Sequence, residues 1–322
     1  VRYYRPYTYT VWVRQAYTVD VPVVTYGPVE VLKTVPAGGS INGTGDVYIR
    51  NASADLAVRV GGSPGVANTL NITKDVLDTI SSGAKSIVIG RDENDSILTG
   101  VATLDNYHFD KAIHVRGSQI EVPGTGSFAD LTSTAKIELT AYEGSGNGDI
   151  QFHSNASPIV APTFLATAFR DVQVDTDIES DAANGLIQIK AGQGASSTGG
   201  ANNSGSIFLD PAASIATTAT GGNIILEAGL SDGDVLLSGP ISSANNMSIH
   251  ALGGRIIQTP SSELTAINLE ARAKEDTHLR TNVDNITLAE ITGIGESLTI
   301  EERNDLIVTE ARTNEGDFSL TT

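Results

Sequence analysis

The chain has 322 residues, no cysteine and a formal net charge of −18. The absence of thiols excludes disulfides and thiolate metal sites, and the negative charge argues against nucleic acid as a partner because phosphate would be repelled. Hydrophobic residues make up 40% of the chain and aromatic residues only 5%, which is typical of strands and turns around an aliphatic core. Since no apolar run reaches about eighteen residues, we expect no membrane span.

The first 34 residues differ from the rest. They carry six of the nine tyrosines, the only tryptophan and a net charge of +2, so the remaining residues sum to −20. Apolar and polar residues alternate from Tyr7 to Val23, which predicts an extended strand. Pro22 and Pro28 lack the N–H that a central strand donates, so we expect an edge or an arm. The predicted assembly interface consists of Tyr7, Tyr9, Val11, Trp12, Val13, Tyr17, Val19, Val21 and Val23.

Two roles are open for this arm. The end of a strand stack exposes unpaired edges, and a strand from a neighbouring molecule can pair with such an edge through its main chain. Repeated head to tail, that contact gives an open filament of identical subunits. The other role is that the arm caps its own stack.

The body, residues 35–322, contains short apolar–polar–apolar runs between Gly, Asn and Asp turns. The pairs at i and i+2 include Ile150 and Phe152, Ile187 and Ile189, Ile224 and Leu226, Ile267 and Leu269, and Phe318 and Leu320, a spacing that predicts short strands. Two segments interrupt this pattern. Residues 73–83 have helical apolar spacing with Thr73 as a candidate cap, and residues 192–206 are rich in Gly, Ser and Asn and predict an exposed loop.

The last forty residues repeat themselves. Asp284–Glu290 is followed about twenty residues later by Asn304–Glu310, and Gly295–Ile300 matches Gly316–Thr321. Such a period indicates a stacked array. The steps from Ile224 to Ile256 to Ile286 to Phe318 cover 30 to 32 residues each, which suggests a coil of three strands per turn. We therefore predict an all-β fold, a parallel β-solenoid, with an antiparallel β-sandwich as the alternative because its strands also recur every 8–12 residues.

The segment from Thr281–Leu288 through Asn314–Asp317 resembles the repeats of large bacterial surface proteins, the filamentous-haemagglutinin-like and autotransporter-passenger β-helix adhesins. The resemblance covers roughly residues 205–322 and is one of style, without a motif unique to one family. It implies a right-handed β-helix at the cell surface that serves adhesion or filament formation. Residues 1–34 do not match those repeats.

Catalytic patterns are not evident. The β-helix polygalacturonases carry an Asn-Thr-Asp triplet, an Asp-Asp pair, a Gly-His-Gly and an Arg-Ile-Lys, and none of these occurs here. The five histidines share no ligand spacing; His114 and His250 follow apolar strand residues and are expected to point outward. We predict that the chain is not an enzyme and needs no cofactor.

Calcium is the open exception, because carboxylate-rich turns can supply the oxygen ligands that Ca²⁺ takes. Plain turn chemistry is the alternative explanation for these residues. The candidate ligands are Asp92, Asp95, Asp149, Asp232 and Asp234.

The expected function is that of an extracellular structural protein at the cell surface. We expect it to be the subunit of a self-assembling filament or adhesin, joined head to tail through its arm, with surface glycans as a possible second partner. The alternative is a polysaccharide-binding or polysaccharide-degrading β-helix, which predicts a cleft of carboxylates along one sheet face with aromatic platforms beside it.

Overall fold

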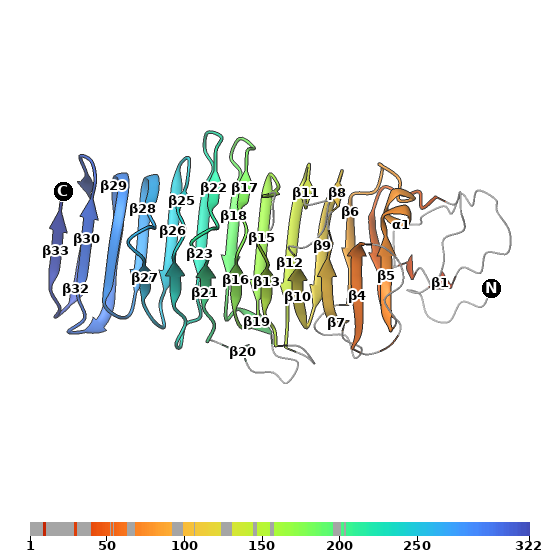
Figure 1. Cartoon of the computed structure of the whole chain (residues 1–322), viewed down its shortest axis with the longest axis horizontal. Coiled ribbons are helices and arrows are strands. Elements are labelled where there is room, and N and C mark those ends of the chain that lie inside the picture. Colours follow the sequence, from red (N-terminus) through yellow and green to blue (C-terminus); the bar gives the residue numbers. More distant parts are fainter. Residues whose placement is uncertain are drawn as a thin grey trace.

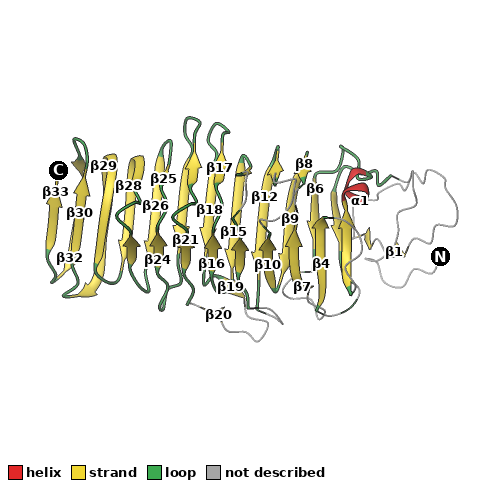
Figure 2. Cartoon of the chain, in the orientation of Figure 1, coloured by secondary structure: helices red, strands yellow, loops and turns green. Residues whose placement is uncertain are grey.

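The computed structural model describes residues 9–10, 29–30, 40–51, 53, 55–62, 68–91, 99–105, 107–123, 131–143, 147–154, 158–195, 201–202 and 204–322. These residues form a rod in which short strands are stacked rung upon rung, with the C-terminus at one end and α1 (Lys74–Asp78) near the other (Figures 1 and 2). The helix search over the described residues finds none with the length and apolar character that a membrane crossing requires.

The rod has three faces, and along its middle each turn of the chain adds one strand to each face. The first face is a continuous nine-stranded sheet. Its strands, in the order in which they pair, are β5 (Thr69–Thr73), β4 (Leu56–Gly61), β7 (Thr99–Leu104), β10 (Gln119–Val122), β13 (Ile150–Phe152), β16 (Val172–Val174), β21 (Ile207–Leu209), β24 (Val235–Leu237) and β27 (Ile256–Gln258).

The second and third faces belong to one larger sheet. Short strands make the second face: β8 (His108–Phe109), β11 (Thr132–Ser133), β14 (Ile159–Val160), β17 (Ile178–Ser180), β22 (Ile215–Thr217) and β25 (Ile241–Ser242). Longer strands make the third face: β3 (Asp46–Ile49), β6 (Ser86–Ile89), β9 (Ala112–Gly117), β12 (Lys136–Ala141), β15 (Thr163–Ala168), β18 (Leu186–Lys190), β23 (Asn223–Glu227) and β26 (Asn246–Ala251).

Two long strands join these faces near the C-terminal end. β28 (Leu264–Ala273) pairs with β25 through its first residues and with β26 through its last. β29 (Thr277–Ile294) then runs through a whole turn, and its successive parts pair with β30 (Leu298–Glu302), β31 (Ile307–Val308) and β32 (Ala311–Asn314). The last strand, β33 (Phe318–Thr321), pairs with β30.

A few elements lie outside the regular rungs. α1 falls inside the predicted 73–83 segment but is shorter than predicted, with Thr73 at its N-cap and Thr79 at its C-cap. The 192–206 segment contains an antiparallel pair, β19 (Gly194–Ala195) with β20 (Ala201–Asn202). Near the N-terminus, β1 (Tyr9–Thr10) pairs in parallel with β2 (Val29–Glu30).

The parallel β-solenoid is therefore confirmed over the described residues, and the sandwich alternative is wrong. Apart from β19 with β20, every described strand pair is parallel. A sandwich would require antiparallel hairpin connections. The right-handed sense stays a prediction.

The predicted turn length of 30 to 32 residues is wrong. Ile224 pairs with Met247, 23 residues on, and Met247 pairs with Leu269, 22 residues on. The prediction compared Ile224 on the third face with Ile256 on the first, because an i, i+2 pair looks the same on every face. The predicted steps therefore joined positions on different faces rather than equivalent positions in successive turns.

The core consists of aliphatic stacks that run along the rod axis. On the third face the same inward position is taken by Ile113, Ile137, Phe164, Ile187, Ile224, Met247 and Leu269, which pair in register from strand to strand. All are at most 1% exposed. The alternation of inward and outward residues along each strand is what the period of two in the sequence encodes.

An asparagine ladder marks the start of the third face in four successive rungs. The amide of Asn246 donates to Asn223 Oδ1 at 2.9 Å, that of Asn268 donates to Asn246 Oδ1 at 3.0 Å, and that of Asn285 donates to Asn268 Oδ1 at 3.2 Å. Asn246 and Asn268 thus each receive one ladder bond and give one, along the same direction as the backbone ladder. Stacked amides of this kind reinforce an in-register array.

Replacing Asn246 by alanine removes two of these bonds and is expected to lower the free energy of unfolding by about 1–2 kcal/mol. Ser248→Ala is the matched control, because Ser248 lies on the same strand and points outward. Urea unfolding followed by circular dichroism measures both. Equal effects of the two substitutions would show that the ladder contributes nothing beyond an ordinary surface position.

Candidate functional site

Most of the predicted assembly interface lies outside the described residues. This holds for Tyr7, Val11, Trp12, Val13, Tyr17, Val19, Val21 and Val23. Tyr9 belongs to β1, whose partner β2 lies twenty residues further along the same segment. Whether the arm donates a strand to a neighbour or caps its own solenoid therefore stays a prediction.

Of the calcium candidates that the structure describes, Asp149 lies apart from Asp232 and Asp234, which share one turn. Asp92 and Asp95 lie outside the described residues. Asp149 and Asp234 precede strands of the first face that are three rungs apart, β13 and β24, and each lies beside an arginine. Asp232 lies in the turn before β24. Among the residues that the structure describes, no three or more His, Cys, Asp or Glu side chains are grouped so that they could hold a metal ion.

Two of the five histidines lie on the third face, where their half-buried side chains point outward, as predicted. His114 Nε2 is 3.0 Å from Thr140 Oγ1, and His250 Nε2 is 3.2 Å from Glu270 Oε1. Both contacts are made to an adjacent strand of the same face. The two histidines therefore join the cross-strand pairs that line this face.

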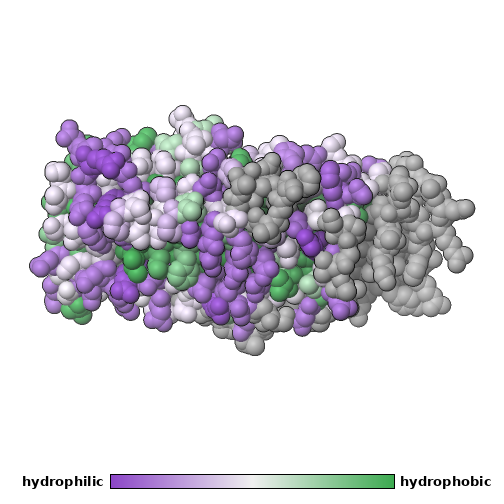
Figure 3. Space-filling view, in the orientation of Figure 1, coloured by the Kyte–Doolittle hydropathy of each residue, from purple (hydrophilic) through white to green (hydrophobic). Residues whose placement is uncertain are grey.

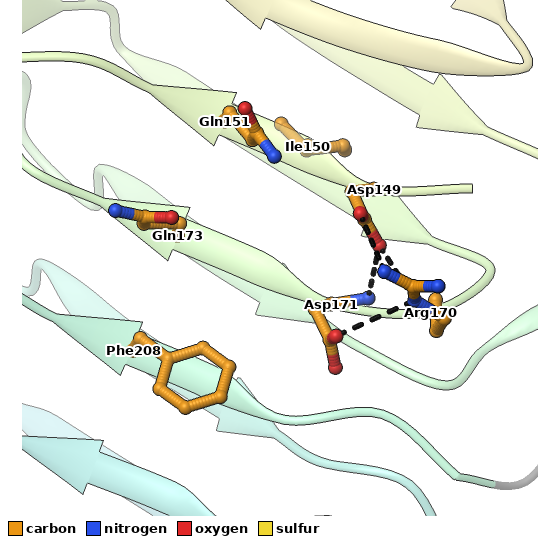
Figure 4. Close-up of a pocket in the computed structure, with 7 residues that line it drawn as sticks. All are labelled: Asp149, Ile150, Gln151, Arg170, Asp171, Gln173 and Phe208. Carbon is orange, nitrogen blue, oxygen red and sulfur yellow. Dashed lines mark hydrogen bonds and ion pairs between the residues drawn. The ribbon is translucent and has the colours of Figure 1, made fainter. Parts of the chain in front are cut away.

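The first face carries a shallow groove across three adjacent strands (Figure 4). Its volume is about 200 Å³. The lining residues come from β13, β16 and β21 and from the turns before them: Asp149, Ile150, Gln151, Arg170, Asp171, Gln173 and Phe208. The pairing register places Gln151, Gln173 and Phe208 side by side at the same outward position.

One end of the groove is closed by an ion pair. Arg170 binds both carboxylate oxygens of Asp149, with Nε to Oδ1 at 3.0 Å and Nη2 to Oδ2 at 2.9 Å. The Asp149 side chain is 6% exposed, whereas that of Arg170 is 45% exposed. Burial raises the pKa of Asp149, and the backbone N–H of Asp171 and the charge of Arg170 oppose that rise. A bidentate pair of this kind fixes the position of the guanidinium.

The turns before the first-face strands repeat one bonding pattern. The backbone N–H of Asp171 donates to Asp149 Oδ1 at 3.2 Å, and that of Ser206 donates to Asp171 Oδ1 at 2.8 Å. In later rungs, the N–H of Arg255 donates to Asp234 Oδ1 at 2.9 Å. Asp149 and Asp234, two of the calcium candidates, thus accept bonds from backbone donors of the next rung. Calcium binding by any of the candidates stays a prediction.

Beyond the groove, the outward positions of the first face become apolar. Phe208 pairs with Leu236, and Leu236 pairs with Ile257. Phe208 is 38% exposed, and Leu236 and Ile257 are half-buried. Apolar surface gathers in this part of the rod, near β24 and β27 (Figure 3). We call Phe208, Leu236 and Ile257 the apolar stripe; its first residue also lines the groove.

No family model matches the chain. Searches of the curated proteins and of the solved structures likewise give no significant match. The function must therefore be argued from the chain's own geometry.

The last rung is the second exposed feature. Phe318 and Leu320 of β33 are 44% and 39% exposed. They pair in register with Leu298 and Ile300, which are at most 1% exposed. Ile294 and Ile307 of the same end are exposed as well, at 75% and 65%. Core stacks of the solenoid thus reach the surface here, next to the open edge of a strand.

The groove was not predicted from the sequence. Gln151, Gln173 and Phe208 each lie between the two apolar residues of an i, i+2 pair, so their outward direction could be read locally. Their neighbourhood could not, because the steps from Gln151 to Gln173 and from Gln173 to Phe208 differ, at 22 and 35 residues. Nothing in the sequence around Arg170 indicates that its side chain lines a groove.

Proposed function

We propose that this chain is a structural rod of an extracellular surface protein, an adhesin or filament of the β-helix type, and that copies join end to end. In this proposal the N-terminal arm of one copy pairs with the last rung of the next. The observation that carries it is the last rung, where Phe318 and Leu320 leave core stacks uncovered. The stylistic resemblance of residues 205–322 to filamentous-haemagglutinin-like repeats agrees with such a role.

The physical gain would come from two sources. A strand laid against β33 would satisfy its unpaired backbone groups. It would also cover Phe318 and Leu320, whose remaining exposure is worth roughly 1 kcal/mol each at the usual value for burying a large apolar side chain. The charges of the two partners are also opposite, since residues 1–34 carry +2 and the rest of the chain −20. Because opposite charges steer association and salt screens them, assembly should weaken as salt rises.

Leu320→Asp tests this proposal. The new carboxylate would have to be buried against the incoming strand, so end-to-end assembly should be lost while the body stays folded. Leu230→Asp is the matched control, because Leu230 is also an exposed leucine, at 51% against 39% for Leu320, and lies in the turn between β23 and β24. Sedimentation velocity and negative-stain microscopy measure particle length.

We expect filaments from the full chain and from Leu230→Asp, and single rods from Leu320→Asp and from a chain lacking residues 1–26. Single rods from the unaltered chain at high concentration would contradict head-to-tail assembly. In that case, further residues of the same polypeptide would be what covers this end of the rod. Filaments from the chain without residues 1–26 would exclude the arm as the donor.

A further inference from the structure

We propose that the groove of the first face and the adjoining apolar stripe bind a neutral polysaccharide, whose chain lies along the rod axis. This inference goes beyond the proposed structural role and does not depend on end-to-end assembly. It rests on the chemistry of the groove, its size, its charge and the pairing of its strands.

The chemistry combines an exposed aromatic ring with amide and carboxylate groups. Phe208 presents its ring at the end of a row formed with Gln173 and Gln151 (Figure 4). A pyranose ring has an apolar C–H face that packs on an aromatic ring and a rim of hydroxyls that bind amides and carboxylates. Gln151 makes no side-chain hydrogen bond within the described residues, and Gln173 holds its amide toward Asp175 at 2.8 Å. Both side chains keep acceptor oxygens for hydroxyls.

The size fits one sugar ring at a time. Pockets that enclose a drug-sized ligand have volumes of about 300–1,000 Å³, and this groove has about 200 Å³. The groove is therefore too small to enclose a whole compact ligand, but it can hold one ring of a polymer. Adjacent rungs lie about 4.8 Å apart, so an extended polymer along the axis meets one outward side chain after another, from Gln151 to Ile257.

The charge selects a neutral polymer over an acidic one. Among the described residues that line the groove, Arg170 is the only cation, and it is held by Asp149 and lies 3.4 Å from Asp171. Two carboxylates against one guanidinium leave the groove with a net negative charge. The whole chain adds −18, which repels uronate, sulfate and phosphate polymers alike.

The strand pairing excludes a peptide that binds by strand addition. β16 is paired on one side with β13 and on the other with β21, and β21 is paired with β24. Their backbone groups are therefore used within the sheet, whereas strand addition needs a free edge. The sheet therefore offers a ligand on this face its side chains, which can pack on sugar rings and bind their hydroxyls.

Affinity electrophoresis tests the proposal with xyloglucan, galactomannan and laminarin as neutral probes and polygalacturonate as the acidic one. All chains carry Leu320→Asp, so that filament formation cannot alter migration and the two proposals fail or succeed separately. We expect at least one neutral polysaccharide to retard the chain, and Phe208→Ala to weaken that binding about tenfold. Polygalacturonate should cause no retardation.

Phe318→Ala is the matched control, since Phe318 is a phenylalanine of similar exposure outside the groove, at 44% against 38% for Phe208. This variant should bind as the parent chain does. Gln173→Ala should weaken binding as well, and circular dichroism verifies that each variant is folded. The proposal is overturned if no neutral probe retards the chain, if only polygalacturonate does, or if Phe208→Ala binds as tightly as Phe318→Ala.

Discussion

Replacing Phe164 by alanine is expected to lower the free energy of unfolding by about 3–5 kcal/mol. Phe164 is fully buried in β15, where its ring lies 5.7 Å from that of Phe152 on the first face. In the stack it lies between Ile137 and Ile187, each paired to it in register. Because ladders on both sides fix the spacing of these backbones, the rungs cannot close around the lost ring, and a cavity remains.

Urea unfolding followed by far-ultraviolet circular dichroism measures this loss as a shift of the transition midpoint. Phe208→Ala is the control for the same substitution at an exposed position, because Phe208 occupies the outward position of β21. Truncating an outward side chain changes stability by no more than about 0.5 kcal/mol. If the two phenylalanine variants were equally destabilised, the inward and outward assignment of these strands would be wrong.

The direction of each side chain could be predicted from the sequence because it depends only on the next residue but one. Ile150 and Phe152, Ile187 and Ile189, and Ile224 and Leu226 are all fully buried, as their spacing predicted. The rule fails at Ile267, which is 44% exposed although Leu269 is buried. There the N–H groups of Ile267 and Asn268 both donate to the carbonyl oxygen of Asn245. The chain turns here from the second face to the third, and the alternation of inward and outward side chains is interrupted.

The pairing between rungs could not be predicted, because it depends on turns of unequal length. The C-terminal repeat was aligned so that Ile286 matched Leu306, but Ile286 pairs with Val308, two residues later. In the second half Leu298 pairs with Phe318 rather than with Ser319. A shift of two keeps the same face, whereas a shift of one exchanges inward for outward. The sequence pattern therefore predicts that the chain forms a solenoid, but it does not predict which residues of successive turns become neighbours.

The groove illustrates the same limit at the level of the site. The sequence suggested Asp149 as a calcium ligand, since carboxylates in turns can supply the oxygen ligands that Ca²⁺ takes. The structure instead places it against Arg170, a residue 21 positions later and in the next turn of the solenoid. A carboxylate in such a sequence can serve a metal, a backbone donor or a guanidinium, and only the register between rungs decides which of them it meets.

Replacing Arg170 by methionine is expected to destabilise the chain by about 3 kcal/mol near neutral pH. Breaking a buried pair by removing one partner costs about 3–5 kcal/mol; the lower end applies because Arg170 is 45% exposed. Among the described residues, the variant leaves the buried carboxylate of Asp149 with the backbone N–H of Asp171 as its donor. Urea unfolding at several pH values above the isoelectric point near 4.5 measures the loss.

The loss should grow as the pH rises. Burial already raises the pKa of Asp149 in the folded chain, so the folded state binds more protons than the unfolded state between the two pKa values. The contribution of Asp149 to stability therefore falls as the pH rises through its folded pKa. Without Arg170 that pKa rises further, and the fall becomes larger and extends to higher pH. The difference between the two chains should be smaller at about pH 5 than at about pH 7.

The double variant Asp149→Asn with Arg170→Met separates charge from shape. It removes both charges while keeping side chains of similar size, so it should recover most of the stability that Arg170→Met loses, and its stability relative to the unaltered chain should lose the extra dependence on pH. Replacing a buried ion pair by uncharged groups is often neutral. A double variant as unstable as Arg170→Met, at both pH values, would mean that Arg170 supports this corner by packing its aliphatic stem rather than by neutralising Asp149.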